Sequence, residues 1–345
     1  MGSARARSGY DAAVLRAFLL LPLFLILAGI PSSASNSRLV LGNEGRMSAF
    51  PVPLDPADPA RTRIGALTYL GGVRLTSPDP AFGGFSAMHV AGEEFVLLSD
   101  SGNIVRFRMG GDWRPRDIRF ADLPGPGSGW YKWERDVEAM TRDSGTGKWW
   151  VAFEIRNDIA RYDAALGRRE AYRYSSSRRK SDPMQQWDTN GGPESFVRLR
   201  DGNFVAISES THPDEDRSQR LALQFAGDPT NRRVGTFVFR YVPPAGFNPS
   251  DMAELPDGRL LVLNRRFRIG DWFSAKLTIV DRKAIARGAI VRGREIATFA
   301  HPLTRDNFEA IAVTQEGEAT IVWLATDDNR AFFERSLLMK FRLED

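Results

Sequence analysis

A pattern that recurs five times along the chain constrains its fold more than any other feature. Each copy contains a small or acidic residue, a short apolar stretch, a turn, an apolar strand and a polar or acidic end. The copies are FSAMHVAGEEFVLLSD from Phe85, VEAMTRDSGTGKWWVAFE from Val137, PESFVRLRDGNFVAISE from Pro193, SDMAELPDGRLLVLN from Ser250 and FEAIAVTQEGEATIVWLATD from Phe308. Their leading residues are 52, 56, 57 and 58 positions apart. Repeats near this length are typical of β-propellers, in which one repeat forms one four-stranded blade.

The segments within each repeat are short and rich in β-branched and aromatic residues. Asp201-Gly202 and Asp257-Gly258 lie between apolar runs, and such dipeptides favour β-hairpin turns. The fifth repeat lacks a fourth strand, which residues Gly65–Leu75 can supply by closing the ring and covering two sheet edges. We therefore predict an all-β fold, a β-propeller of five blades closed by an N-terminal strand. Six blades are the alternative, if residues 39–81 contribute more than one strand.

The N-terminal region differs from the repeats. Residues 1–34 have the order of a secretory signal peptide: three arginines, the apolar stretch Ala17–Ile30 and small residues at Ser32–Ala34. A membrane anchor is the alternative, but a span needs about 20 apolar residues. We expect an exported protein, periplasmic or secreted, with no stable membrane span after cleavage. Residues 35–64 contain several prolines and predict an extended arm whose removal costs little, and residues 65–345 form the propeller domain.

Composition excludes several classes of function. The formal net charge is +4, and residues 1–34 hold three Arg and one Asp, so the mature chain carries +2. This near balance argues against a nucleic-acid partner. The chain has no cysteine, which excludes disulfides and thiol chemistry, and its three histidines are too far apart for a zinc site. Phosphate-binding Gly-Lys-Ser/Thr loops, dinucleotide fingerprints and a complete G-x-S-x-G elbow are absent from the sequence.

Acidic residues occupy equivalent places in the repeats. The leading positions are Ser86, Glu138, Glu194, Asp251 and Glu309. A second set ends the following strands at Asp100, Glu154, Glu209, Asn264 and Asp327. Because the first strand of every blade lines the central channel, we expect the leading side chains to meet at one mouth of it. Carboxylates gathered there need raised pKa values or a bound cation. Alternatively, each acid bonds backbone N–H groups and locks one blade to the next.

The same segments resemble a known family. FGGFSAM with LLSDSG, NGGPESF, FNPSDMAEL with LLVLNRR, and DNFEAIAV with LATDDN are similar, in this order, to the esterase-like phytase family of bacterial phytase-like domain proteins. The resemblance runs from about Gly65 to Leu343. It implies a propeller-like fold, an exported location, and phosphoester or ester hydrolysis. Asp136-Val137-Glu138 departs from the family, which more usually has a glycine-containing approach to that glutamate.

These observations lead to a first functional hypothesis, a metal-dependent phosphoester or ester hydrolase of a small molecule. Its catalytic residues are Glu138, Glu194 and Glu309. Its metal ligands are Asp100, Glu138, Glu194, Asp251, Glu309 and Asp327. Oxygen-only ligands suit a divalent cation, with calcium as the first candidate. Arg156 and Arg265 lie just beyond two strand ends and are the predicted binders of an anionic substrate.

Two other hypotheses remain open at the level of sequence. The propeller is a non-catalytic binding or scaffold module of the cell envelope, or it is a sugar-lactonase-like hydrolase with a single channel cation. Asn190 and Asn264 leave room for the latter. The substrate and the oligomeric state are left open.

Overall fold

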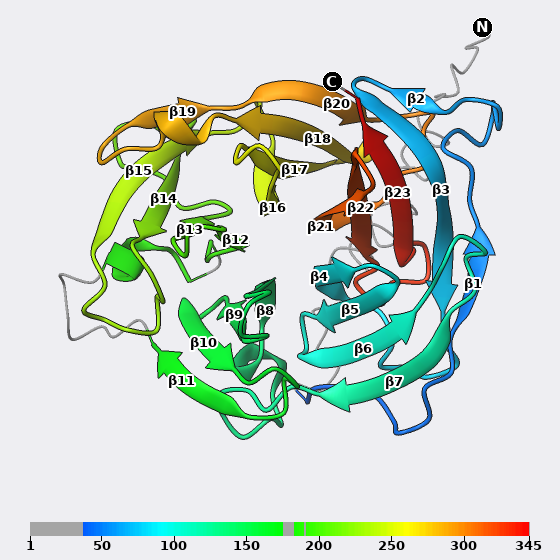
Figure 1. The fold of residues 1–345 in the computed structure, drawn as a ribbon, viewed down its shortest axis with the longest axis horizontal. Helices are drawn as coiled ribbons and strands as arrows, with labels where there is room; N and C mark the ends of the chain where they lie inside the picture. Colours follow the sequence, from blue (N-terminus) through cyan, green and yellow to red (C-terminus); the bar gives the residue numbers. More distant parts are fainter. Residues whose placement is uncertain (1–36, 175–182, 190, 345) are drawn as a thin grey trace, which may run out of the picture.

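Five sheets stand in a ring in the computed structural model, which describes residues 37–174, 183–189 and 191–344 (Figure 1). Blade 1 contains β4 (Phe85–Ala91), β5 (Glu94–Ser99), β6 (Asn103–Arg108) and β7 (Arg116–Asp122). Blade 2 contains β8 (Val137–Arg142), β9 (Trp149–Phe153), β10 (Asp158–Tyr162) and β11 (Arg169–Arg173). Blade 3 contains β12 (Ser195–Arg198), β13 (Phe204–Ile207), β14 (Arg220–Phe225), β15 (Thr236–Val242) and the parallel β19 (Ile290–Arg292).

The remaining two blades complete the ring. Blade 4 contains β16 (Asn248–Glu254), β17 (Leu260–Arg268), β18 (Trp272–Val280) and β20 (Arg294–Phe299). Blade 5 contains β21 (Asn307–Glu316), β22 (Ala319–Asp327), β23 (Leu337–Leu343), β3 (Leu67–Thr76) and β1 (Ser48–Pro51), with β2 (Arg63–Ile64) beside β3. The described helices are single 3₁₀ turns at Lys132–Glu134, Pro183–Gln186 and Arg282–Ala284. Among the described residues, none of the helices has the length and apolar character needed to cross a membrane.

The predicted closure of the ring is confirmed. β3 pairs antiparallel with β23, from Leu67 opposite Leu343 to Arg74 opposite Leu337. Residues from the two ends of the chain therefore complete blade 5, which Figure 1 shows in blue and red side by side. The five-blade prediction is confirmed as well, because residues 39–81 add outer strands to blade 5 rather than a separate blade.

The segment before β3 is more firmly attached than the arm that the sequence suggests. β1 pairs with β3, Leu54 is fully buried in the core, and Arg38 donates to both carboxylate oxygens of Asp122 at 2.5 and 2.7 Å. The prolines do not prevent this packing, because Pro51 ends its strand. The predicted signal peptide, residues 1–34, lies outside the described residues.

The hydrophobic core lies between the blades. Both faces of a blade are covered by its neighbours, so a strand such as β9 is buried along its whole length. Trp149 packs in a cluster shared with blade 1, whereas Trp150 on the opposite face packs in a cluster shared with blade 3. This packing fixes the innermost strands, β4, β8, β12, β16 and β21, around the channel (Figure 1).

Candidate functional site

Four of the five innermost strands have a β-bulge near their start, which displaces one side chain from the regular alternation of the strand. The extra residues of β4, β8, β16 and β21 are Ser86, Glu138, Ser250 and Glu309. Glu194 precedes β12 at the equivalent place in blade 3. Bulges redirect side chains and often lie beside functional sites. These five equivalent positions are therefore occupied by three glutamates and two serines.

In blade 4 the structure places Ser250, and not Asp251, at this position. Ser250 Oγ donates to the backbone oxygen of Phe308 at 3.1 Å, and Ser86 Oγ donates in the same way to Val137 at 2.7 Å. Asp251 lies one residue further on. Its carboxylate accepts the backbone N–H groups of Met252 and Ile311, both at 2.8 Å. Asp251, a predicted metal ligand, thus joins blade 4 to blade 5 and is not brought to the acidic mouth.

The second set of positions shows the same one-residue shift. In the strand register, the equivalent positions near the ends of the second strands are Asp100, Glu154, Glu209, Arg265 and Asp327. Asn264 is fully buried, accepts from the Tyr241 hydroxyl at 2.9 Å and donates to Thr278 at 3.2 Å. Arg265 therefore occupies the place where the four other blades carry an acid.

Arg265 is the counter-ion of the mouth. Its Nη2 lies 3.0 Å from Glu209 Oε1 and 3.8 Å from Glu194 Oε1, and its Nε lies 3.3 Å from Glu309 Oε1. Burial opposes its charge, but these carboxylates raise the pKa of the guanidinium above its ordinary value. The other predicted substrate-binding residue, Arg156, pairs with Asp158 at 3.3 Å and is not brought to this network.

The carboxyl groups of blades 2 and 3 form the densest part of the mouth. Asp136, Glu138 and Glu154 have oxygens within 4.8 Å of one another, and Glu154, Glu194 and Glu209 form a second such group. Burial, followed by the charge of Glu194, raises the pKa of Glu138 well above its ordinary value. Burial, followed by the charge of Asp136, raises the pKa of Glu154 to about 7. A proton or a cation is needed to hold this group together.

Cations balance part of the acidic charge of the mouth. Lys132 Nζ lies 2.8 Å from Asp100 and 3.6 Å from Asp136, and Arg330 Nη2 lies 3.1 Å from Asp100. Burial alone would raise the pKa of Asp100, but Lys132 and Arg330 hold it below its ordinary value. Asp327 accepts the backbone N–H of Asn329 at 2.6 Å, and its pKa is raised by burial and by neighbouring acids. Neither Asp100 nor Asp327 belongs to the two oxygen groups described above.

Sequence reasoning missed three residues of the site. Asp136 and Lys132 lie in the loop between β7 and β8, and Arg330 lies in the turn between β22 and β23. These residues lie outside the five repeated segments, so the repeat pattern could not predict that they belong to the site. The Asp-Val-Glu sequence at Asp136 was the available hint, because it places a second acid two residues before Glu138.

Comparisons with known proteins identify the family to which this chain belongs. No match was found among curated proteins. Solved structures similar to this chain include the Pan2 WD40 domain of Neurospora crassa (12% identity, 83% of this chain and 97% of that one, TM-score 0.37). A second is a luciferin-regenerating enzyme (8% identity, 86% of this chain and 96% of that one, TM-score 0.39). A third is a protein of unknown function from Bacteroides thetaiotaomicron (14% identity, 89% of this chain and 70% of that one, TM-score 0.41). A family model described as "Phytase-like: Esterase-like activity of phytase" matches residues 80–330, and the chain therefore belongs to this phytase-like family.

Proposed function

We propose that the acidic mouth is the active site of a hydrolase that cleaves an ester or phosphoester of a small, anionic molecule with the help of a divalent cation. One observation carries this proposal, the two groups of carboxylate oxygens that share Glu154. Membership of a family described by its esterase-like activity supports it.

The residues present fit a cation of the calcium or magnesium type. The donors are carboxylate oxygens throughout, which these cations prefer. Asp136, Glu138 and Glu154 would hold it, or Glu154, Glu194 and Glu209. A bound cation supplies polarisation of the substrate oxygen and a more acidic water. Calcium is our first candidate, because several carboxylates converge here without a nitrogen ligand among the described residues.

The protein's own side chains then have separate tasks. Arg265 keeps Glu194, Glu209 and Glu309 in fixed positions. Lys132 is half-exposed at the rim, where its ammonium can meet the negative charge of an incoming substrate. Glu309 accepts the side-chain amide of Asn307 at 2.7 Å, which orients its carboxylate toward the mouth. Glu138, Glu194 and Glu309 remain the proposed catalytic carboxylates.

Purified mature protein tests the proposal. It should release phosphate or alcohol from members of a panel of phosphomonoesters, carboxylic esters and lactones when calcium, magnesium or manganese is present. Chelation should abolish this activity, and Glu154→Gln should reduce kcat/KM by about 100-fold or more, the scale of losing a charge-stabilising group. The control is Glu316→Gln, which removes a half-exposed acid paired with Lys340 far from the mouth. Inactivity toward the whole panel with each cation would refute the proposal.

A binding or scaffold propeller is the second candidate, favoured by the completeness of the Arg265 network and the serine contacts between blades. In that case Glu154→Gln reduces the rise in Tm that calcium causes, while wild-type protein hydrolyses nothing.

We also propose that the protein is exported, on the basis of the signal-peptide pattern of residues 1–34. Fractionation of cells that express the full chain, with the N-terminus of the mature protein determined by mass spectrometry, tests this. Full-length protein in the cytoplasm would contradict it.

A further inference from the structure

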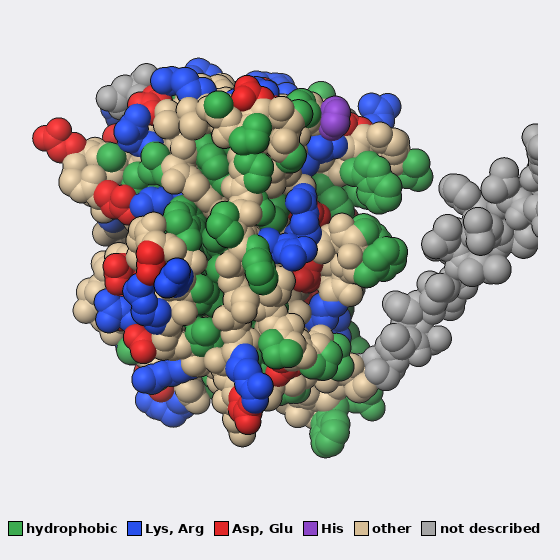
Figure 2. All heavy atoms as spheres, turned by 90° about the vertical axis from the view of Figure 1, so that its right-hand side faces the viewer, with side chains coloured by type: hydrophobic (Ala, Val, Ile, Leu, Met, Phe, Trp, Pro, Cys, Tyr) green, Lys and Arg blue, Asp and Glu red, His purple; other side chains and the backbone are tan. Residues whose placement is uncertain are grey.

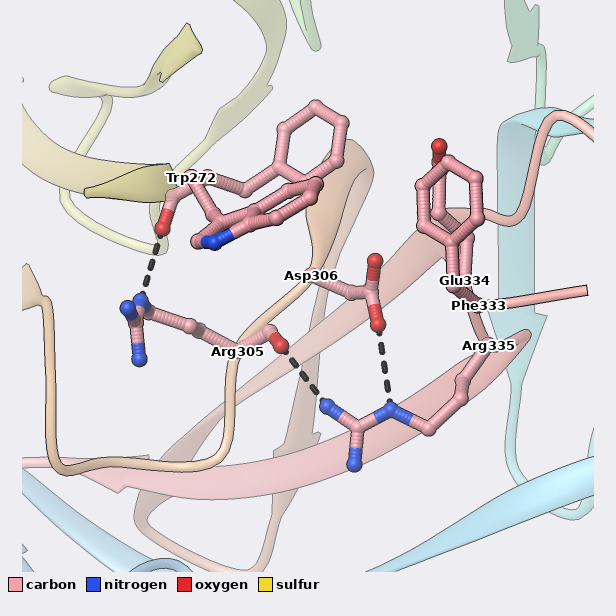
Figure 3. Close-up of a pocket in the computed structure, with 7 residues that line it drawn as sticks. Trp272, Arg305, Asp306, Phe333, Glu334 and Arg335 are labelled. Carbon is pink, nitrogen blue, oxygen red and sulfur yellow. Dashed lines mark hydrogen bonds and ion pairs between the residues drawn. The ribbon is translucent and has the colours of Figure 1, made fainter. Parts of the chain in front are cut away.

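A cleft of about 200 Å³ opens beside the acidic mouth, between the start of β18 in blade 4 and the segment before β23 in blade 5 (Figure 3). It shares its wall with the mouth. Asp306 lines the cleft, and the next residue, Asn307, donates its side-chain amide to Glu309. Asn329 makes a second link, since its backbone bonds Asp327 and its side chain bonds Glu334 at 2.8 Å. Hydrogen bonds therefore connect the lining of the cleft to Glu309 and Asp327 of the mouth.

Two aromatic side chains form the sides of this cleft. The rings of Trp272 and Phe333 have centroids 6.0 Å apart and are tilted by 58°, and both side chains are more than half exposed. Trp272 has a φ of +55°, a left-handed conformation that is unfavourable for a residue with a bulky side chain. Figure 2 shows that several hydrophobic side chains project from the surface of the molecule. Because Trp272 is largely exposed, packing in the core does not explain its strained backbone, and we infer that its side chain has a role in binding.

The floor of the cleft is polar and held in place. Arg335 Nε pairs with Asp306 at 3.1 Å, and its Nη2 donates to the backbone oxygen of Arg305 at 2.8 Å. Arg305 in turn donates through Nε to Phe273 O at 2.7 Å and through Nη2 to Asp271 O at 3.1 Å. Figure 3 shows Asp306 between Trp272 and Phe333, with the Arg335 guanidinium beside it. The third nitrogen of each arginine has no hydrogen-bond partner in the described part of the chain.

We propose that this cleft binds a sugar ring, and that the substrate is therefore an ester or phosphoester of a sugar. This inference rests on the proposed function of the adjacent mouth. A sugar ring has C–H faces that can lie on Trp272 and Phe333, and hydroxyl groups that can bond Arg305, Arg335, Asp306 and Glu334. An acyl chain would cover those charged groups without forming hydrogen bonds to them and would remove them from water, which is costly. An inorganic anion would leave the aromatic rings unused and would meet two carboxylates.

The size of the cleft agrees with one ring. A cavity of about 150 Å³ holds a benzene molecule, so a cleft of about 200 Å³ has room for a single six-membered ring. The arrangement of an apolar wall with a few oriented polar groups is what small-molecule sites generally show.

Binding is tested first, independently of catalysis. Methyl glycosides of glucose, galactose and mannose are titrated into wild-type protein, with calcium and with chelator, and followed by saturation-transfer NMR. At least one should bind, and Trp272→Ala and Phe333→Ala should each weaken that binding by about tenfold or more. The matched control is Trp130→Ala, which removes a tryptophan of 74% exposure from the loop between β7 and β8. Melting curves verify that the exposed positions tolerate the changes.

Hydrolysis gives the second readout. Trp272→Ala should lower kcat/KM for acetylated or phosphorylated methyl glycosides by about tenfold, whereas the control Trp130→Ala should leave it unchanged. Failure of every glycoside to bind wild-type protein, or equal binding by Trp272→Ala, overturns the sugar inference even when simple esters are hydrolysed. Glycoside binding that Trp272→Ala abolishes supports the cleft even when no ester is cleaved, an outcome that refutes only the proposed hydrolase.

Discussion

His89 illustrates how burial and neighbouring charges change the pKa of a side chain. It lies on β4 and contacts the Trp149 ring edge-to-face at 4.9 Å between centroids. Burial, followed by the charges of Arg142 and Arg106, lowers the pKa of His89 to about 4. An unfolded chain would protonate the same imidazole near pH 6.5. Folding therefore competes with protonation of His89 at mildly acidic pH.

The sign of this effect leads to a prediction. Between pH 6.5 and 4 the unfolded chain binds a proton that the folded chain excludes, so stability is lost as the pH falls through this range. Replacing His89 by Gln removes the effect. We expect the free energy of unfolding of wild-type protein to fall by roughly 2 kcal/mol more than that of His89→Gln between pH 7 and pH 5. Urea denaturation at both pH values measures it.

His212→Gln is the control, because His212 lies in the loop between β13 and β14 and is only partly buried. It should follow wild-type protein at both pH values. Parallel pH dependence in His89→Gln and wild-type protein would show that His89 does not carry the effect.

At the level of strands, the repeat predicted the sheets, the hairpins and the closing strand, because these depend on apolar periodicity and turn residues. It also brought Glu138, Glu194 and Glu309 to one mouth. In blade 4, however, the repeat pattern assigned the two site positions one residue away from where the structure has them: to Asp251 instead of Ser250, and to Asn264 instead of Arg265. An alignment of the acidic residues of the repeats puts Asp251 at the leading position. In the structure, the bulge between Pro249 and Asp251 puts Ser250 there. A bulge is decided by backbone pairing, which residue types alone do not specify.

The place of Asp251 in the structure gives a prediction that separates a link between blades from a metal ligand. In Asp251→Asn, one backbone N–H of Met252 or Ile311 faces an amide donor and loses its acceptor inside the core. The cost should be about 1–3 kcal/mol of unfolding free energy. The rise in Tm on adding calcium should be the same as in wild-type protein. Glu154→Gln should show the reverse, with a small loss of stability and a reduced response to calcium.

At the level of the whole molecule, the ring is closed by contacts between residues far apart in sequence. β3 is the only connection in the described chain between β23 and the outer strands β1 and β2. Leu67 and Val73 of β3 are fully buried, in two different core clusters. Closure thus joins the core between blades 4 and 5 to the core between blades 5 and 1. Residues before β3 add further contacts, since Leu54 packs in the core between blades 4 and 5 and Arg38 pairs with Asp122 at the end of β7.

Two truncations distinguish these contributions. A chain that begins at Arg61 loses β1, Leu54 and Arg38 but keeps β3, so the ring stays closed. It should be soluble and folded with a lower Tm, since burial of one leucine alone contributes about 1.5–3 kcal/mol. A chain that begins at Ser77 loses β3, which exposes the edge of β23 and opens two core clusters. Exposed strand edges pair with other chains, so this variant should aggregate. Light scattering and thermal melting compare the two, and a soluble, cooperatively melting chain from Ser77 onward would show that β3 does not hold the ring closed.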